Sequence, residues 1–320
     1  MRLTACLLGA ALGAGAQLRP VAVIPLAGVE GRIDHLACDA AGGHLFVAAL
    51  GNNTVEVIDL AAGRRVRSLT GFAEPQGVAY LAQGPRLYVA NGGDGRVTVL
   101  DGATLARMAD IAWEGDADNL RYDAGAGRVW VGYGAGALGE MDAASGRRLG
   151  EVKLAAHPES FQLERGSERL YVNMPQAGHV AVVDRRRRTV LAHWPVPGAA
   201  ANYPMALDEE NHRLFIGCRK PAEVLVYNTD TGKVTTRFAC PGDTDDLFCD
   251  AARQRLYISG GDGTLAIVRQ TGPDRYERAG TIRTGAGART CLFVPASGRL
   301  YLAVPHRGTQ RAEVRVFQTE

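Results

Sequence analysis

A short strand motif recurs seven times along the chain at almost constant spacing. Each copy has an aliphatic, an aromatic and a second aliphatic residue, and the copies begin at Leu45, Leu87, Val129, Leu170, Leu214, Leu256 and Leu300. The gaps between these anchor residues are 42, 42, 41, 44, 42 and 44 residues. A period of about 40 residues with several short strands indicates propeller blades. We therefore expect an all-β protein, a seven-bladed β-propeller with four-stranded antiparallel blades.

The residues around each anchor predict how the blades pack. Three consecutive apolar positions indicate a strand covered on both faces, as in a blade between two neighbours. Nine and seven residues before each anchor lie further apolar residues, which share one side of a strand with a period of two. These residues are Leu36, Val78, Leu120, Phe161, Met205, Leu247 and Cys291, and Cys38, Tyr80, Tyr122, Leu163, Leu207, Cys249 and Phe293. We expect them to form the inner strands and to pack on the adjacent blade.

The last blade is one strand short. Its expected strands cover residues 290–294, 300–304 and 312–317, after which the chain ends. The segment from Val21 to Leu26 has the composition of a strand but no blade of its own. We predict that it supplies the outer strand of blade 7, which closes the ring and pairs both edges.

The N-terminus has the features of a secretory signal peptide. Arg2 precedes a short apolar run over residues 3–12, and small residues at 14–16 provide a cleavage site. We predict a signal peptide over residues 1–16 and a single propeller domain over residues 17–320. The protein is then exported, either periplasmic or extracellular. No other segment reaches the ~18 apolar residues of a membrane span, and we expect a monomer.

Five cysteines follow the predicted signal peptide: Cys38, Cys218, Cys240, Cys249 and Cys291. Their number is odd and no Cys-x-x-Cys pair occurs, which argues against covalent haem and against a thiolate zinc site. Buried core cysteines are the simplest interpretation, and one disulfide with unassigned partners is the alternative. The formal net charge is +2, so the total charge gives no reason to expect nucleic acid or a membrane surface as a partner.

The segment from Leu87 to Asp101, LYVANGGDGRVTVLD, resembles the repeat of the YVTN (YncE-like) β-propeller proteins. Residues 45–59 and 170–184 follow the same frame, with Asn173 at the position of the family's asparagine. The resemblance covers essentially the whole mature chain, although residues 215–219 and 257–260 depart from the motif. It implies seven four-stranded blades and, usually, an exported bacterial protein. It implies no catalytic set.

Polar residues are expected to gather at the channel mouth. In a propeller, the turn leading into each inner strand and the turn after each second strand lie on the same face. Eleven residues before the anchors are Asp34, Gln76, Asp118, Glu159, Tyr203, Asp245 and Arg289, and ten before are His35, Gly77, Asn119, Ser160, Pro204, Asp246 and Thr290. From these registers and the turns we predict a ligand-binding mouth of Asp34, His35, Asp118, Asn119, His157, Glu159, Tyr203, Arg219, Asp245, Asp246, Arg289 and His306.

Four blades place an acid at the same register. Like charges around a narrow channel are unfavourable unless a cation, a proton or a basic partner compensates them. Asp34, Asp118, Glu159 and Asp245 are therefore the candidate ligands of a divalent cation, calcium or magnesium. A histidine among them suits manganese or zinc. Basic residues on blades 5 and 7 make the other side of the mouth positive. Alternatively, these polar residues cap strand ends or bind channel water.

Four consecutive arginines, residues 185–188, form the strongest charge run. They are expected in the turn between the third and outer strands of blade 4, on the face opposite the acidic mouth. Such a patch could bind nucleic acid, but a solvated turn is the preferred interpretation.

The chain has no nucleophile motif and no phosphate-binding loop, so its catalytic residues are unknown. The sequence favours a binding module that holds a small molecule or a protein partner at the channel mouth. The first alternative is a metal-assisted lactonase or hydrolase with His35 or His157 as the base. The second is nucleic-acid binding through the basic turns.

Overall fold

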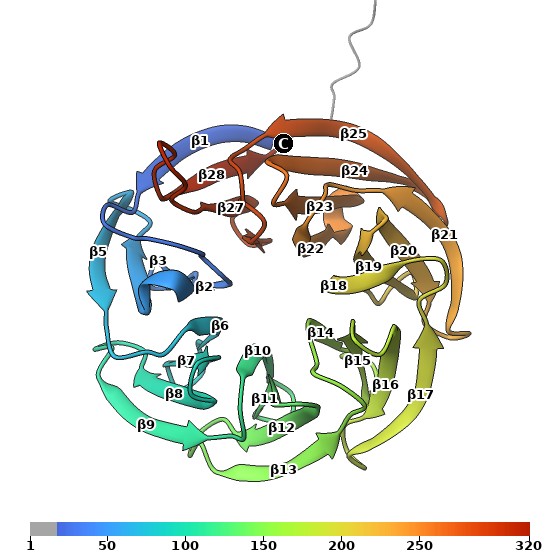
Figure 1. The fold of residues 1–320 in the computed structure, drawn as a ribbon, viewed down its shortest axis with the longest axis horizontal. Helices are drawn as coiled ribbons and strands as arrows, with labels where there is room; N and C mark the ends of the chain where they lie inside the picture. Colours follow the sequence, from blue (N-terminus) through green and yellow to red (C-terminus); the bar gives the residue numbers. More distant parts are fainter. Residues whose placement is uncertain (1–17) are drawn as a thin grey trace, which may run out of the picture.

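The computed structural model describes residues 18–320. They form seven four-stranded antiparallel sheets that close into a ring around a central channel (Figure 1). The helical content of this part of the chain is two short 3₁₀ turns, η1 (Leu50–Asn52) and η2 (Ala251–Arg253). The predicted seven-bladed propeller is confirmed.

The strands of blades 1 to 6 follow one another from the channel to the rim. Blade 1 comprises β2 (Leu36–Asp39), β3 (His44–Ala49), β4 (Thr54–Asp59) and β5 (Arg64–Leu69). Blade 2 comprises β6 (Pro75–Leu81), β7 (Arg86–Asn91), β8 (Arg96–Asp101) and β9 (Arg107–Ala112). Blade 3 comprises β10 (Ala117–Asp123), β11 (Arg128–Tyr133), β12 (Ala137–Asp142) and β13 (Arg148–Lys153).

The second half of the ring repeats this order. Blade 4 comprises β14 (Phe161–Leu163), β15 (Arg169–Met174), β16 (His179–Asp184) and β17 (Thr189–Pro195). Blade 5 comprises β18 (Ala200–Asp208), β19 (Arg213–Lys220), β20 (Ala222–Asn228) and β21 (Lys233–Ala239). Blade 6 comprises β22 (Thr244–Asp250), β23 (Arg255–Gly260), β24 (Thr264–Gly272) and β25 (Arg275–Arg283). Blade 7 comprises β26 (Cys291–Val294), β27 (Arg299–Val304), β28 (Glu313–Thr319) and β1 (Leu18–Pro25).

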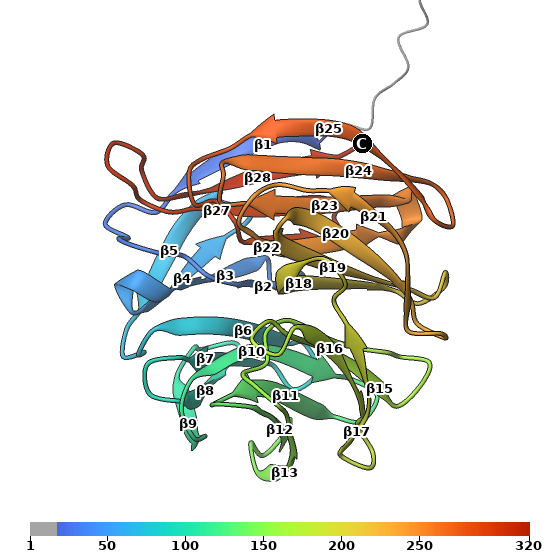
Figure 2. The same cartoon turned by 45° about the vertical axis from the view of Figure 1, so that its right-hand side comes forward.

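Blade 7 combines the two ends of the chain. Strand β1 runs antiparallel to β28, from Leu18 opposite Thr319 to Pro25 opposite Glu313, and lies beside it at the rim (Figure 2). The predicted closing strand is therefore confirmed, although it begins three residues earlier than expected and ends at Pro25 rather than Leu26. Because β1 completes blade 7, the two ends of the chain belong to one sheet and the ring is closed.

Apolar contacts between blades hold the ring together. Seven hydrophobic clusters are present among the described residues, one between each pair of neighbouring blades. The anchor aromatics lie at their centres, with Tyr88 0% and Trp130 1% exposed. The residues predicted nine positions before each anchor are all buried. The repeat therefore encodes the interface between blades as well as the strands themselves.

Two expectations about the N-terminus concern residues outside the described part of the chain. The predicted signal peptide, residues 1–16, and its cleavage site lie there. Residues 18–320 contain no helix with the length and hydrophobicity that a membrane span requires.

The five cysteines of the described chain are all free. Cys218, Cys240 and Cys291 are buried, and Cys38 and Cys249 are half-buried. The interpretation as core cysteines therefore agrees with the structure, and the alternative of a disulfide does not.

Candidate functional site

The predicted mouth residues lie where each inner strand leaves its regular ladder. In blade 3 the pairing jumps from Ala117 opposite Tyr133 to Leu120 opposite Val131, so two residues oppose one. The same irregularity occurs between Pro75 and Val78, between Asn202 and Met205, and between Thr244 and Asp246. These are β-bulges, which turn side chains out of the sheet and are common at functional sites. In blades 2, 3 and 5 the two registers read from the sequence are the two residues of the bulge, whereas in blade 6 only Asp245 is extra and Asp246 pairs with Ser259.

Three side chains at the border of blades 3 and 4 come together as a candidate metal cluster. Asp118 comes from β10, and His157 and Glu159 come from the segment leading into β14. Each offers one ligand atom, and these atoms all lie within 4.8 Å of one another. Two ligands of one ion are separated by no more than about twice a coordination distance of ~2.0–2.6 Å. The three side chains can therefore share a cation after small rotations.

Hydrogen bonding determines which nitrogen of His157 faces the cluster. Nδ1 lies 2.6 Å from the carbonyl oxygen of Gly134, in the turn between β11 and β12. A carbonyl oxygen only accepts, so Nδ1 carries the proton and donates it. Nε2 lies 3.8 Å from Asp118 Oδ2 and 3.9 Å from Asp116 Oδ2. A backbone carbonyl that orients an imidazole in this way is the usual outer partner of a metal-binding histidine.

The cluster holds protons tightly in the metal-free protein. The pKa of Glu159 is raised to about 8, because its carboxyl is buried and lies in the fields of Asp118 and Asp245. The pKa of His157 is raised to about 9, since its contact with Asp118 outweighs the burial that opposes its charge. Burial also opposes the charge of Asp118, yet His157 and His35 hold the pKa of this carboxyl below its ordinary value. A cation entering the cluster would displace protons from it.

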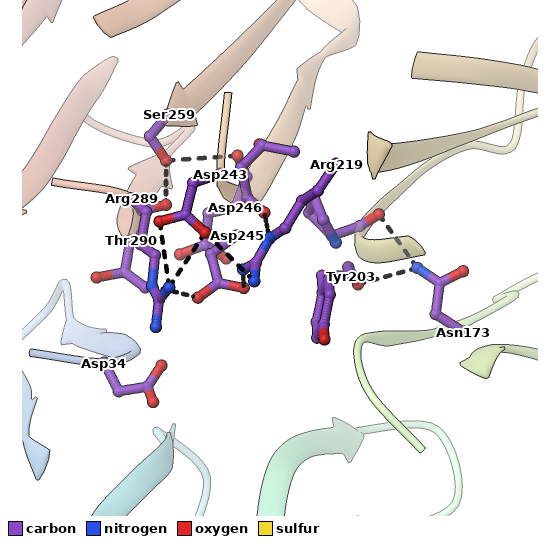
Figure 3. Close-up of polar contacts among 12 residues, drawn as sticks. Asp34, Asn173, Tyr203, Arg219, Asp243, Asp245, Asp246, Ser259, Arg289 and Thr290 are labelled. Atoms are coloured by element: carbon purple, nitrogen blue, oxygen red, sulfur yellow. Dashed lines mark hydrogen bonds and ion pairs between the residues drawn. The ribbon is translucent and has the colours of Figure 1, made fainter. Parts of the chain in front are cut away.

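The opposite part of the mouth carries arginines that neutralise the carboxylates of blade 6 (Figure 3). Arg219, at the end of β19, donates through Nη2 to Asp245 Oδ1 at 2.6 Å and through Nε to the carbonyl of Thr244 at 2.9 Å. Arg289 pairs through Nε with Asp245 Oδ2 at 2.9 Å. The guanidinium of Arg219 also lies 3.9 Å from the centre of the Tyr203 ring. These contacts explain why Asp245 does not join the metal cluster.

Hydrogen bonds from Asn173 hold the backbone at Tyr203 in place. Asn173, in β15, donates to the carbonyl oxygen of Tyr203 at 2.9 Å and to that of Pro204 at 3.2 Å. The asparagine of the repeat motif therefore joins blade 4 to the bulge of blade 5 and supports the aromatic surface under Arg219 (Figure 3).

Two further predicted residues form an ion pair across the ring closure. His35 Nδ1 lies 3.5 Å from Asp246 Oδ1, and Asp246 Oδ2 accepts from the backbone N–H of Cys291 at 2.8 Å. Burial disfavours the charged imidazole, but Asp246 and Asp34 raise the pKa of His35 to about 10. His35 is therefore a cation at neutral pH and is not available as a general base.

The remaining predicted residues have separate surroundings. Asp34 is buried and accepts from Arg32 Nη2 at 2.6 Å, so it is compensated by an arginine and lies outside the three-residue cluster. Asn119 is buried and its Oδ1 has no hydrogen-bond partner among the described atoms. His306 pairs with Glu30 at 2.7 Å in the loop after β1, where both side chains are partly exposed.

Sequence reasoning missed Arg32, Asp116 and Asp243. All three lie thirteen residues before an anchor, as does His157 (45 − 32, 129 − 116, 256 − 243 and 170 − 157). Asp116 lies beside the metal cluster, and Asp243 Oδ1 lies 3.3 Å from Arg219 and 3.2 Å from Arg289. The fixed spacing to each anchor could have found this register, although all four residues precede the first residue of their inner strand.

The basic run on the other face is largely neutralised. It lies in the turn between β16 and β17, as predicted. Arg185 pairs with Asp123 at 2.7 Å, Arg187 with Asp184 at 3.6 Å and Arg188 with Glu140 at 2.6 Å. These pairs leave little positive charge for the phosphates of a nucleic acid.

The solved structures that this chain matches share its fold at low sequence identity. No model of a protein family matches it, and no curated protein does. Solved structures match widely, with 1773 chains sharing the fold. Hydrazine synthase of Kuenenia stuttgartiensis matches with a TM-score of 0.77 and 15% identity, covering 87% of this chain and 94% of that chain. A chain of the mitotic checkpoint complex matches with a TM-score of 0.80 and 15% identity, covering 99% and 97%. Such neighbours show the propeller alone, so function is argued from the site.

Proposed function

We propose that this protein is a divalent-cation-dependent binding module that holds a small ligand at the channel mouth. Asp118, His157 and Glu159 supply the metal ligands. The observation that carries this proposal is the approach of their ligand atoms to within 4.8 Å, with Nε2 of His157 directed into the cluster by the bond from Nδ1 to Gly134. Three protein ligands leave coordination positions for a small molecule.

The donor set favours some ions over others. One imidazole and two carboxylates suit manganese or zinc, whereas calcium prefers an all-oxygen set. Asn119 directly follows Asp118 in the chain, and its unpartnered Oδ1 is a further candidate oxygen donor. Manganese and zinc are therefore the first ions to test, with calcium and magnesium as comparators.

Thermal unfolding of the metal-stripped protein tests the proposal directly. A ligand that binds only the folded state stabilises it by about 2.7 kcal/mol at a hundredfold excess over Kd. We expect manganese or zinc to raise the melting temperature of the wild type and to leave Asp118→Asn unchanged. Asp94→Asn is the matched control, because Asp94 is an exposed turn carboxylate that pairs with Arg96. An equal shift in Asp118→Asn, or no shift for any ion, would remove the proposal.

A metal-assisted hydrolase is the second candidate, supported by Asp116. Its carboxyl lies beside His157, outside the three ligands, and its pKa is raised by burial and by Asp118. It could accept a proton from an attacking water. We expect Asp116→Asn to abolish turnover of a lactone and ester panel while keeping the metal-induced thermal shift. If the metal-loaded wild type hydrolyses no member of the panel, the hydrolase is rejected and the binding module is the one proposed function that stands.

We also propose export from the cytoplasm, which rests on residues 1–16 and on the resemblance to the YVTN repeat proteins. Fusion of residues 1–16 to a reporter that is active only outside the cytoplasm tests it. We expect activity with the native segment and none when the apolar run over residues 3–12 carries two inserted aspartates.

A further inference from the structure

A cavity of about 430 Å³ occupies the channel beyond the mouth. Its wall contains residues from all seven blades, at positions seven to ten residues before each anchor. Asp118, His157 and Glu159 do not line it. The cavity is therefore a space distinct from the metal cluster, and a ligand can occupy it whether or not the cluster holds a metal.

Arg121 projects into this cavity from β10. Nη1 donates to the carbonyl oxygen of Leu120 at 2.8 Å, and Nη2 lies 3.3 Å from the hydroxyl of Ser160. The guanidinium also lies 5.5 Å from the centre of the Phe161 ring. No carboxylate of residues 18–320 lies within 4.0 Å of it, unlike the arginines of the mouth. A guanidinium has five N–H donors, so most of its donor capacity is unused.

The other titratable groups of the wall leave the charge of Arg121 uncompensated. His35 is a cation, since its pKa is raised to about 10, and it is already paired with Asp246. Burial raises the pKa of Cys38 to about 11 and that of Cys249 to about 12, so both thiols are neutral. The wall thus carries two cations against one carboxylate, a net charge of +1. Burial lowers the pKa of Arg121, and the fields of Asp246 and Asp118 oppose this shift only in part.

A second cavity gives this position its own access. It has a volume of about 560 Å³, and Arg121, Tyr122, Gln162 and Leu207 line both cavities. Asp123 and Arg185, at the end of β10 and in the turn after β16, also line it. A small molecule can therefore reach Arg121 from the face opposite the mouth without passing the metal cluster.

We infer that the channel cavity is a binding site for a small oxoanion, a carboxylate or a phosphate, with Arg121 as its anchor. The planar fork of N–H groups matches two oxygens of such an anion. The anion brings the missing negative charge into a cavity whose wall carries a net charge of +1.

Binding of trifluoroacetate, followed by ¹⁹F NMR on metal-stripped protein at constant ionic strength, tests this inference. The variants are Arg121→Gln and Arg165→Gln. Arg165 also lines the second cavity, but its side chain is 91% exposed and pairs with Glu209. We expect the Kd of Arg121→Gln to rise at least about tenfold, and that of Arg165→Gln to stay close to the wild type.

Displacement experiments identify the class of ligand. Acetate and inorganic phosphate should both displace trifluoroacetate, and the stronger competitor identifies whether the site prefers a carboxylate or a phosphate. Neutral methyl acetate should not compete. Unchanged binding in Arg121→Gln, an equal loss in Arg165→Gln, or no saturable binding by the wild type would each overturn the inference. If Arg121→Gln does not fold, Arg121→Lys keeps the charge and removes the fork, and its Kd should still rise.

Discussion

Nδ1 of His157 lies 2.6 Å from the carbonyl oxygen of Gly134, and this contact crosses the boundary between blades 3 and 4. It directs Nε2 towards Asp118 on the neighbouring blade. The candidate metal site therefore belongs to an interface between blades, where two repeats supply different ligands. A single repeat could not form it.

Metal affinity should rise with pH. In the metal-free protein the pKa of Glu159 is about 8 and that of His157 about 9, so protons compete with the ion below these values. We expect the Kd for manganese to fall steadily from pH 6 to pH 9 and to level off above, measured by titration calorimetry. A Kd that does not change with pH would contradict the assignment of these two residues as ligands.

The ion pair of His35 and Asp246 predicts a pH dependence of stability. The folded pKa of His35, about 10, lies above the unfolded value of 6.5, so the pair stabilises the fold fully below pH 6.5. This contribution is lost as the pH rises towards 10. Urea unfolding of the wild type and His35→Gln should show a free-energy difference that is largest near pH 6 and smallest near pH 10. A constant difference would show that His35 acts by packing alone.

Removal of Arg219 should destabilise the protein. Asp245 would keep only Arg289 and Asp243 would lose one partner, and a buried carboxylate without full compensation is costly. We expect Arg219→Gln to lower the free energy of unfolding by ~2–3 kcal/mol. Arg269→Gln is the control, because Arg269 and Glu277 form an exposed pair at 3.2 Å worth less than ~0.5 kcal/mol. Equal effects of the two changes would refute the role given to Arg219.

Two neighbouring residues of β1 test the closure of the ring. Ile24 is 2% exposed in the cluster between blades 7 and 1, and Val23 is 55% exposed. We expect Ile24→Ala to cost ~2–4 kcal/mol of unfolding free energy, since it leaves a cavity in this interface. Val23→Ala should cost less than ~0.5 kcal/mol. Chemical denaturation measures both, and similar losses would mean that β1 is not packed as the structure shows.

In the basic turn of blade 4, we expect Arg185 to stabilise the fold and Arg186 to contribute little to stability. Arg185 pairs with Asp123 and donates to the backbone carbonyls of Glu164 and Ser167, whereas Arg186 is exposed. We expect Arg185→Gln to lower the free energy of unfolding by ~2 kcal/mol and Arg186→Gln to change it by less than ~0.5 kcal/mol. The wild type should give no gel shift with DNA or RNA at low salt. A shift that both substitutions reduce would favour the nucleic-acid alternative.

Much of the fold could be read from the chain because it depends on local pattern. The burial of Tyr88 and Trp130 follows from apolar runs that require cover on both faces. The closing strand followed from a count, since blade 7 lacked one strand and the N-terminus had one to spare. The registers at the mouth followed from their fixed spacing to the anchors and from the place of the turns in a propeller, but the bulges that turn them into the channel did not.

The sequence alone determines the number of blades, the closure of the ring and the register that brings polar residues to one face. The physical reason is that each repeat encodes its own strands and also the apolar surface that packs against the adjacent blade. Which charges meet was decided only by the tertiary structure. Asp34, Asp118, Glu159 and Asp245 are equivalent in the repeat, yet Asp34 and Asp245 are compensated by arginines and Asp118 and Glu159 meet His157. The partner of each carboxylate depends on the adjacent blade and on the direction of each bulge. Pair energies at these distances change steeply with separation and burial.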